Sequence, residues 1–147
     1  MRIDWRVSKK LARFLLDVAN KSLSQQDSLP CRRNLPRLRR MCENWSACNV
    51  VVYVSRSNAE PYCVGQRIHL PHPSLYDNDY GLIARSLLHE MSHARDNDFG
   101  IDTGPEDSED RANAAELALS QSEIRLLAMN NDLRSLGVPS SFFRGVS

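Results

Sequence analysis

The sequence, 147 residues long, lacks any long hydrophobic run. No stretch approaches the ~20 apolar residues that a membrane-spanning helix needs, and charged residues are spread through the segment after Met1. We therefore expect no transmembrane segment and no Sec-type signal peptide, in a protein that is cytoplasmic or exported by a non-Sec route. With 41% hydrophobic and 25% charged residues, the composition is that of one soluble globular domain, long enough to bury a core.

Paired cysteine motifs are also missing. The chain has no Cys-x-x-Cys pair, and no histidine stands at zinc-finger spacing from any of its four cysteines, which are Cys31, Cys42, Cys48 and Cys63. Two disulfides remain the alternative for a secreted chain. Because no signal sequence is expected, free buried thiols are the favoured interpretation.

The chain has little net charge, formally +1, but that total hides an asymmetry. Residues 1–76 contain 13 Lys or Arg against 5 Asp or Glu, whereas residues 77–147 contain 6 against 13. Five of the arginines lie in residues 32–40. This run favours a solvated helix face, and a surface for nucleic acid or an acidic partner is the alternative. No aromatic residues interleave with the arginines to stack on bases.

Hydrophobic periodicity and turn residues predict an α+β domain. Apolar residues at helical spacing predict amphipathic helices over residues 5–23 and 79–97, and a proline suggests a short helix over residues 36–44. β-branched and aromatic residues predict a strand over residues 49–54 and a weaker edge strand, interrupted by glycine, over residues 62–70.

A long C-terminal helix is expected over residues 108–136, with Ser108 as its N-cap and Gly137 and Pro139 beyond its end. There are no internal repeats and no long low-complexity tract. We therefore expect a single domain over residues 1–147, with a helical part over residues 1–48 and the sheet and later helices over residues 49–136.

The motif His-Glu-x-x-His, at residues 89–93, carries the chemistry. On a helix, residues four apart share one face, so His89 and His93 can bind the same metal ion. Zinc at such a site lowers the pKa of a bound water, and Glu90 then acts as the general base and passes the proton to the leaving group. The motif therefore predicts a catalytic zinc site.

Two histidines leave such a site short of the three protein ligands that catalytic zinc uses. No histidine follows His93, and the metzincin pattern is excluded because Asp96 and Phe99 occupy its glycine and histidine positions. The third ligand should therefore be a carboxylate. The candidates downstream are Glu109, Glu116 and, in the intervening loop, Asp98, Asp102 and Glu106.

Roughly residues 60–120 resemble the gluzincin metalloproteases, and the helix with the His-Glu-x-x-His motif is the specific part of this resemblance. Glu109 and Asn113 stand at the spacing of the Glu-x-x-Ala-Asn or Glu-x-x-x-Asp motif that supplies the third ligand and a supporting residue in that family. The run Ser-Glu-Asp-Arg-Ala-Asn, and His-Ala-Arg-Asp from His93, are similar to segments of the mitochondrial inner-membrane protease that processes an ATP synthase subunit. Small bacterial and phage zincins have similar layouts.

This resemblance implies a minimal zincin-like domain with a small, mostly antiparallel sheet, and one Zn²⁺ held by His89, His93 and Glu109. It implies a zinc metallopeptidase, a hydrolase acting on a protein or peptide substrate, in which Glu90 is catalytic. Glu116 is the fallback ligand. In zincins an edge strand pairs with the substrate, and residues 62–70 are assigned that role.

Further positions are assigned by sequence alone. Asp96 and Asn113 are candidates to accept the second N–H of a metal-bound imidazole. The candidate donors to an oxyanion are Tyr62, His69, His72, Tyr76 and Tyr80, each of which is more commonly a structural residue. The two tryptophans, Trp5 and Trp45, are expected at the core or its edge.

Three functional hypotheses follow. The favoured one is a zinc-dependent endopeptidase. The alternative is a regulatory or nucleic-acid-binding protein that keeps a zincin scaffold and uses residues 32–40 as its contact surface, which is not favoured. A structural zinc domain is a third hypothesis, but such a site has no need of the base Glu90. No membrane partner is expected, and the sequence leaves the oligomeric state open.

Overall fold

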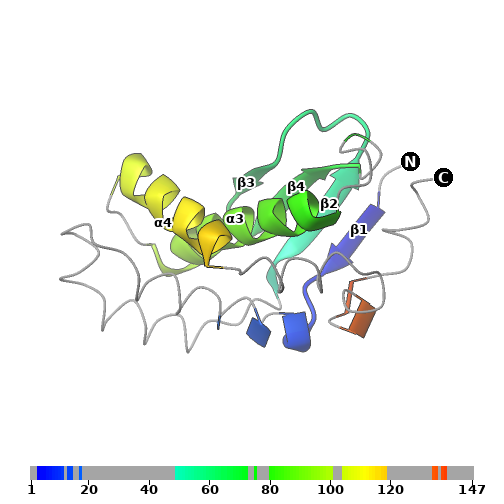
Figure 1. The fold of residues 1–147 in the computed structure, drawn as a ribbon, viewed down its shortest axis with the longest axis horizontal. Helices are drawn as coiled ribbons and strands as arrows, with labels where there is room; N and C mark the ends of the chain where they lie inside the picture. Colours follow the sequence, from blue (N-terminus) through cyan, green and yellow to red (C-terminus); the bar gives the residue numbers. More distant parts are fainter. Residues whose placement is uncertain are drawn as a thin grey trace.

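The computed structural model describes residues 3–11, 13, 14, 17, 49–72, 75, 80–100, 104–118, 134, 135, 137 and 138. Their main elements are the strands β1 (Ile3–Arg6), β2 (Val51–Ser55), β3 (Tyr62–Val64) and β4 (Arg67–Pro71) and the helices α3 (Tyr80–Phe99) and α4 (Pro105–Leu117). Figure 1 shows α3 running across the sheet and α4 beside α3. The expected α+β class is confirmed.

The four strands form one mixed sheet in the order β1-β2-β4-β3. β1 pairs with β2 and β3 pairs with β4 in antiparallel fashion, whereas β2 and β4 are parallel. In the described part of the chain, β3 therefore lies at one edge of the sheet, with β4 as its neighbour. Two of the three strand pairings are antiparallel, as expected, and the parallel pair lies in the middle.

The core lies between one face of the sheet and α3. Val52 and Val54 of β2 stand opposite Ile68 and Leu70 of β4, and all four side chains are at most 1% exposed. They alternate with more exposed residues along each strand, as expected when one face of a sheet is buried. From α3 the core receives the apolar residues that recur at three- and four-residue steps, Ala84, Leu87, Leu88, Met91 and Ala94.

Two polar contacts hold the β3–β4 turn against α3. The Gln66 side chain donates to the carbonyl of Ala94 at 2.6 Å, and the Asn97 side chain donates to the carbonyl of Gly65 at 3.1 Å. Gly65 has a φ of 59°, a left-handed conformation that glycine adopts without strain. The turn therefore places the edge strand β3 alongside the second half of α3.

Small residues allow α4 to approach α3 closely. Ala112 and Ala115 on α4 are at most 3% exposed, and Ala94 on α3 is fully buried. Short side chains bring helix backbones together, so longer side chains beside them can reach across the interface. This close packing brings polar residues of α4 next to the His-Glu-x-x-His face of α3.

Three sequence-based expectations were wrong in detail. The single strand expected over residues 62–70 is a hairpin of β3 and β4, because the chain turns at Gly65. The helix expected from Trp5 begins later: Trp5 lies in β1, where its pairing with Val52 buries the indole in the core. Residues 9–11, 13, 14 and 17 are helical.

The third correction concerns the start of the last helix. Ser108 is not its N-cap, because α4 begins at Pro105 with Gly104 as the N-cap residue. Proline suits the first turn of a helix, where its missing N–H has no intrahelical partner. Ser108 lies inside α4, so its hydroxyl is available for other contacts. Residues 119–133, expected to continue this helix, lie outside the described residues.

Several other expectations also fall outside the described residues, namely the arginine run at residues 32–40, the short helix at 36–44, Cys31, Cys42, Cys48 and Trp45. Cys63 is free, as expected, and is partly rather than fully buried. Among the described residues, no helix is both long enough and apolar enough to cross a membrane.

Candidate metal centre

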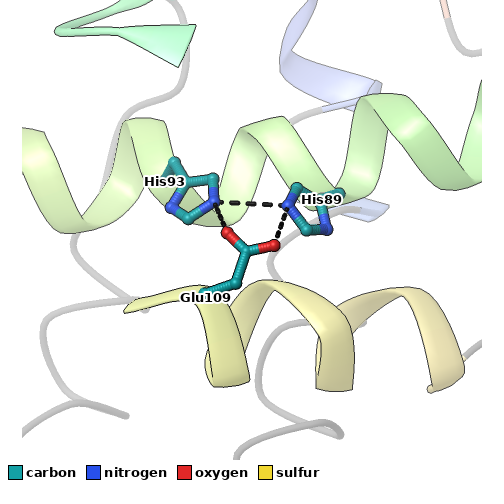
Figure 2. Close-up of side chains that lie close together, drawn as sticks. All are labelled: His89, His93 and Glu109. Atoms are coloured by element: carbon teal, nitrogen blue, oxygen red, sulfur yellow. Dashed lines mark hydrogen bonds and ion pairs between the residues drawn. The ribbon is translucent and has the colours of Figure 1, made fainter. Parts of the chain in front are cut away.

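Three side chains from α3 and α4 converge on one point. The Nε2 atoms of His89 and His93 lie 3.3 Å apart, and the Glu109 carboxylate reaches both, with 3.0 Å from each of its oxygens to one imidazole. Figure 2 shows the two rings on successive turns of α3 and Glu109 rising from α4 to meet them. We call these three residues the triad. The structure thus brings together the three residues that the sequence predicted as metal ligands.

The protons on the imidazoles can be assigned from their other nitrogens. His89 Nδ1 contacts a carboxylate oxygen of Glu116, and a carboxylate only accepts, so Nδ1 carries the proton. The Ser108 hydroxyl donates to Asp96 Oδ2 at 3.0 Å, so it accepts from His93 Nδ1, which is 2.9 Å away. Metal ligation requires a neutral imidazole, which has one N–H, and in that form both Nε2 atoms direct lone pairs at the triad centre.

This assignment leaves only acceptors at the centre of the triad. Two nitrogen lone pairs and a carboxylate repel one another at 3.0–3.3 Å unless a positive charge lies between them. The ligand atoms all lie within 4.8 Å of one another. In a tetrahedral zinc site with bonds of about 2.0–2.1 Å, ligand atoms lie about 3.3 Å apart. The types of ligand atom and the distances between them therefore both fit a zinc ion.

Glu116 orients His89 from the side away from the triad centre. Its hydrogen bond raises the pKa of His89 above the ordinary value, and the charges of Glu109, Glu116 and Glu90 act in the same direction, whereas burial opposes them. The Glu116 side chain is 32% exposed. Glu116 was the fallback ligand in the sequence analysis; its carboxylate contacts Nδ1, whereas Glu109 contacts Nε2.

A buried polar network supports His93. Asp96 accepts hydrogen bonds from Ser108 and, at 3.0 and 2.9 Å, from Nε and a terminal nitrogen of Arg111. Its other oxygen accepts from Arg95 at 3.2 Å. Asp96, Arg95 and Arg111 are at most 3% exposed. Asp96 thus acts on His93 through Ser108, not directly as the sequence suggested.

The sequence patterns did not predict the roles of Ser108 and Arg111. A serine near the start of a helix suggests a cap, and an arginine suggests a solvated face, so neither residue type pointed to this network. One signal was present: Ser108, Arg111 and Ala112 share the apolar side of α4 that packs on α3. Asn113, expected to support the site, is exposed, and in the described part of the chain the Nδ1 atoms of the two imidazoles contact Glu116 and Ser108 instead.

Glu90 lies beside the triad and is 5% exposed. Among the described residues it has no hydrogen-bond or ion-pair partner, and its side chain borders two neighbouring pockets. Burial raises the pKa of Glu90 to about 7; the His89 charge opposes this shift, and the carboxylates of Glu109 and Glu116 add to it. A carboxyl with a pKa near neutrality both accepts and returns a proton at physiological pH.

The triad opens into a cavity of about 380 Å³ between α3, α4 and the edge strand. We call it the triad pocket; it is lined by Pro61, Tyr62, Cys63, His89, Glu90, His93, Asn97 and Glu109. Burial raises the pKa of Cys63 to about 12, and the Glu90 charge adds to the shift. The thiol is therefore protonated at neutral pH in the metal-free protein, and Cys63 does not belong to the group of side chains whose ligand atoms converge.

The remaining candidates do not belong to the triad. Asp98 and Glu106 are exposed, and Asp102 and Tyr76 lie outside the described residues. Tyr62 lines the triad pocket, but its ring stacks on His69 at a centroid distance of 4.3 Å. His69 stacks in turn on Tyr53, which stands beside it across the β2–β4 pair. His72 is 3% exposed, and burial lowers its pKa.

Comparison with known proteins returns no match: no protein-family model, no curated protein and no solved structure matches this chain. The similarity to gluzincins rests on the motifs alone.

Proposed function

We propose that this protein is a zinc-dependent peptidase in which His89, His93 and Glu109 hold the ion. The observation that carries the proposal is the convergence of three acceptors: two Nε2 lone pairs and one carboxylate meet at 3.0–3.3 Å, and both imidazole protons are engaged on the far sides of the rings. Two nitrogens and one carboxylate, with a pocket in front of them, are the ligand set of catalytic zinc.

Glu90 supplies the proton-transfer group. It follows the first histidine on α3, borders the triad pocket and has no hydrogen bond that would have to break before it acts. When bound, zinc supplies Lewis-acid polarisation and lowers the pKa of water. The Glu90 carboxylate accepts a proton at its oxygen and, as the acid, returns one to the leaving amine.

The edge strand β3 is the proposed binding surface for the substrate backbone. Pro61, Tyr62 and Cys63 line the triad pocket, and β3 has a strand on one side in the described part of the chain. An extended peptide adds to such an edge through main-chain hydrogen bonds, which recognise the backbone and not the sequence. A peptide lying there passes in front of the triad, and this position favours peptide hydrolysis over other hydrolytic reactions.

The test is cleavage of a peptide pool by the zinc-loaded wild type and the Glu90→Gln variant. We expect Glu90→Gln to keep one zinc per chain and to lose about 10²–10⁴-fold in cleavage rate, the usual contribution of a general base. Glu106→Gln is the matched control, because Glu106 is exposed on α4 and lines neither pocket. Cleavage by Glu90→Gln at the wild-type rate would contradict the mechanism.

A further inference from the structure

A second cavity of about 380 Å³ adjoins the triad pocket. It is lined by Glu60, Pro61, Ser86, His89, Glu90 and Glu116, and it shares Pro61, His89 and Glu90 with the triad pocket. We call it the acidic pocket. It lies on the Glu116 side of His89, one helical turn towards the start of α3, and its volume is in the range of small-ligand sites.

Among the described residues, the lining of the acidic pocket contains three carboxyl groups and no basic residue other than the ligand His89. Glu60 is exposed at its mouth, and Glu116 keeps lone pairs beyond the one that His89 uses. Glu90 is 95% buried, since its exposed fraction is 5%, and among the described residues no donor reaches its carboxyl. This carboxyl borders the cavity, so a donor group that enters the cavity can reach it.

We propose that the acidic pocket is a specificity subsite that binds the ammonium or guanidinium group of a substrate lysine or arginine. The inference rests on the proposed peptidase function. A long basic side chain packs its methylenes beside Pro61 and places its donors among the carboxylates of Glu60 and Glu116.

The direction of the strands predicts which substrate residue enters. Glu60 and Pro61 lie beside Ser86, and Gly65 bonds to Asn97, so β3 and α3 run the same way. A peptide that adds to β3 in antiparallel fashion runs in the opposite direction. Its C-terminal part therefore lies towards Glu60, and the acidic pocket receives a side chain that follows the cleaved bond.

The experiment compares peptides that are identical except for Lys, Arg, Gln or Glu at the position after the bond that the wild type cleaves. We expect kcat/KM for Lys and Arg to exceed that for Gln by about 10-fold, the strength of a charge-assisted hydrogen bond, and Glu to be the poorest substrate. Glu60→Lys should lower the Lys/Gln ratio to about 1 or below. Glu106→Lys, the same charge change outside both pockets, should keep the wild-type ratio.

The outcomes separate this inference from the proposed function. Cleavage that depends on Glu90 but shows no basic preference, or a preference that Glu60→Lys leaves intact, overturns the subsite and keeps the peptidase. If no peptide is cleaved, fluorescence anisotropy with the labelled Lys and Gln peptides and the zinc-loaded protein decides. Tighter Lys binding that is lost in Glu60→Lys keeps the subsite without the peptidase, and equal binding overturns it.

Discussion

His89 and His93 lie one turn apart on α3 and point at the same carboxylate, yet different groups hold them. His89 is held by one carboxylate, Glu116, whose side chain is 32% exposed. His93 is held by a hydroxyl, and behind that hydroxyl lies the buried network of Asp96, Arg95 and Arg111. The first support is a direct charge, whereas the second passes through a neutral group.

The two supports therefore have different roles, one in tuning an imidazole and the other in holding the fold together. A carboxylate on Nδ1 increases the basicity of an imidazole and can be lost with little effect on the core, because its own environment is open. A buried aspartate between two arginines also joins α3 to α4, so the His93 support belongs to the fold as much as to the site. We therefore expect mutations on the His93 side mainly to lower the free energy of unfolding. Mutations on the Glu116 side should mainly lower the zinc affinity.

The largest effect is expected from Asp96→Asn. The change leaves Arg111, which is fully buried, and Arg95, which is 1% exposed, without their shared carboxylate. Removing one partner of a buried ion pair costs about 3–5 kcal/mol, to be measured as the free energy of unfolding by urea in the metal-free protein. Asp98→Asn, on the same helix but exposed, should change that free energy by less than about 0.5 kcal/mol. Equal losses in the two variants would remove the distinction between the two supports.

The next largest effect is on zinc affinity. Glu116→Gln keeps the shape of the side chain but removes the charge that acts on His89, so we expect a 10–100-fold weaker zinc affinity, the usual effect of losing such a partner. Its metal-free stability should change by less than about 1 kcal/mol, because the carboxylate is partly solvated. Calorimetric zinc titration measures the first quantity and urea unfolding the second. Ser108→Ala should weaken zinc binding less, since it removes a hydroxyl and not a charge.

The smallest effect is a pH dependence confined to one side of the triad. Glu116 raises the pKa of His89, so in the metal-free protein their interaction stabilises the fold below the unfolded-state value of about 6.5. That contribution is lost as pH rises through the folded-state pKa. An NMR titration of the His89 ring should show a midpoint above the ordinary value, which falls in Glu116→Gln. Ser108→Ala should leave the His89 midpoint unchanged; a fall there as well would mean that the supports are coupled.

The sequence predicted the local parts of the site and missed the long-range ones. His89, Glu90 and His93 follow from spacing on one helix, and the helix expected over residues 79–97 is α3, with ends one and two residues later. Glu109 came from a resemblance in a short motif, and the structure places it at the two imidazoles. The network behind Ser108 depends on how closely α4 approaches α3. The sequence pattern of either helix alone does not predict that distance.

In the fold, too, local features could be predicted from the sequence and long-range pairings could not. The β-branched run over residues 49–54 predicts the strand β2 because such residues fit a half-buried pleated sheet, and Val52 and Val54 are fully buried there. The turn at Gly65 and the strand at Trp5 depend on partners far away in the chain. In isolation, Trp5 fits the helical period of the residues that follow it. Its pairing with Val52 is a tertiary interaction that overrides this local preference.

Identifying the atoms that bind zinc tests the proposed triad most directly. X-ray absorption at the zinc edge of the zinc-loaded protein measures the ligand atoms around the ion. We predict two imidazole nitrogens and carboxylate or water oxygens at about 2.0–2.2 Å, with no sulfur, because the convergent ligand atoms belong to His89, His93 and Glu109 and not to Cys63. A sulfur shell at about 2.3 Å, or no imidazole scattering from the bound zinc, would contradict the triad.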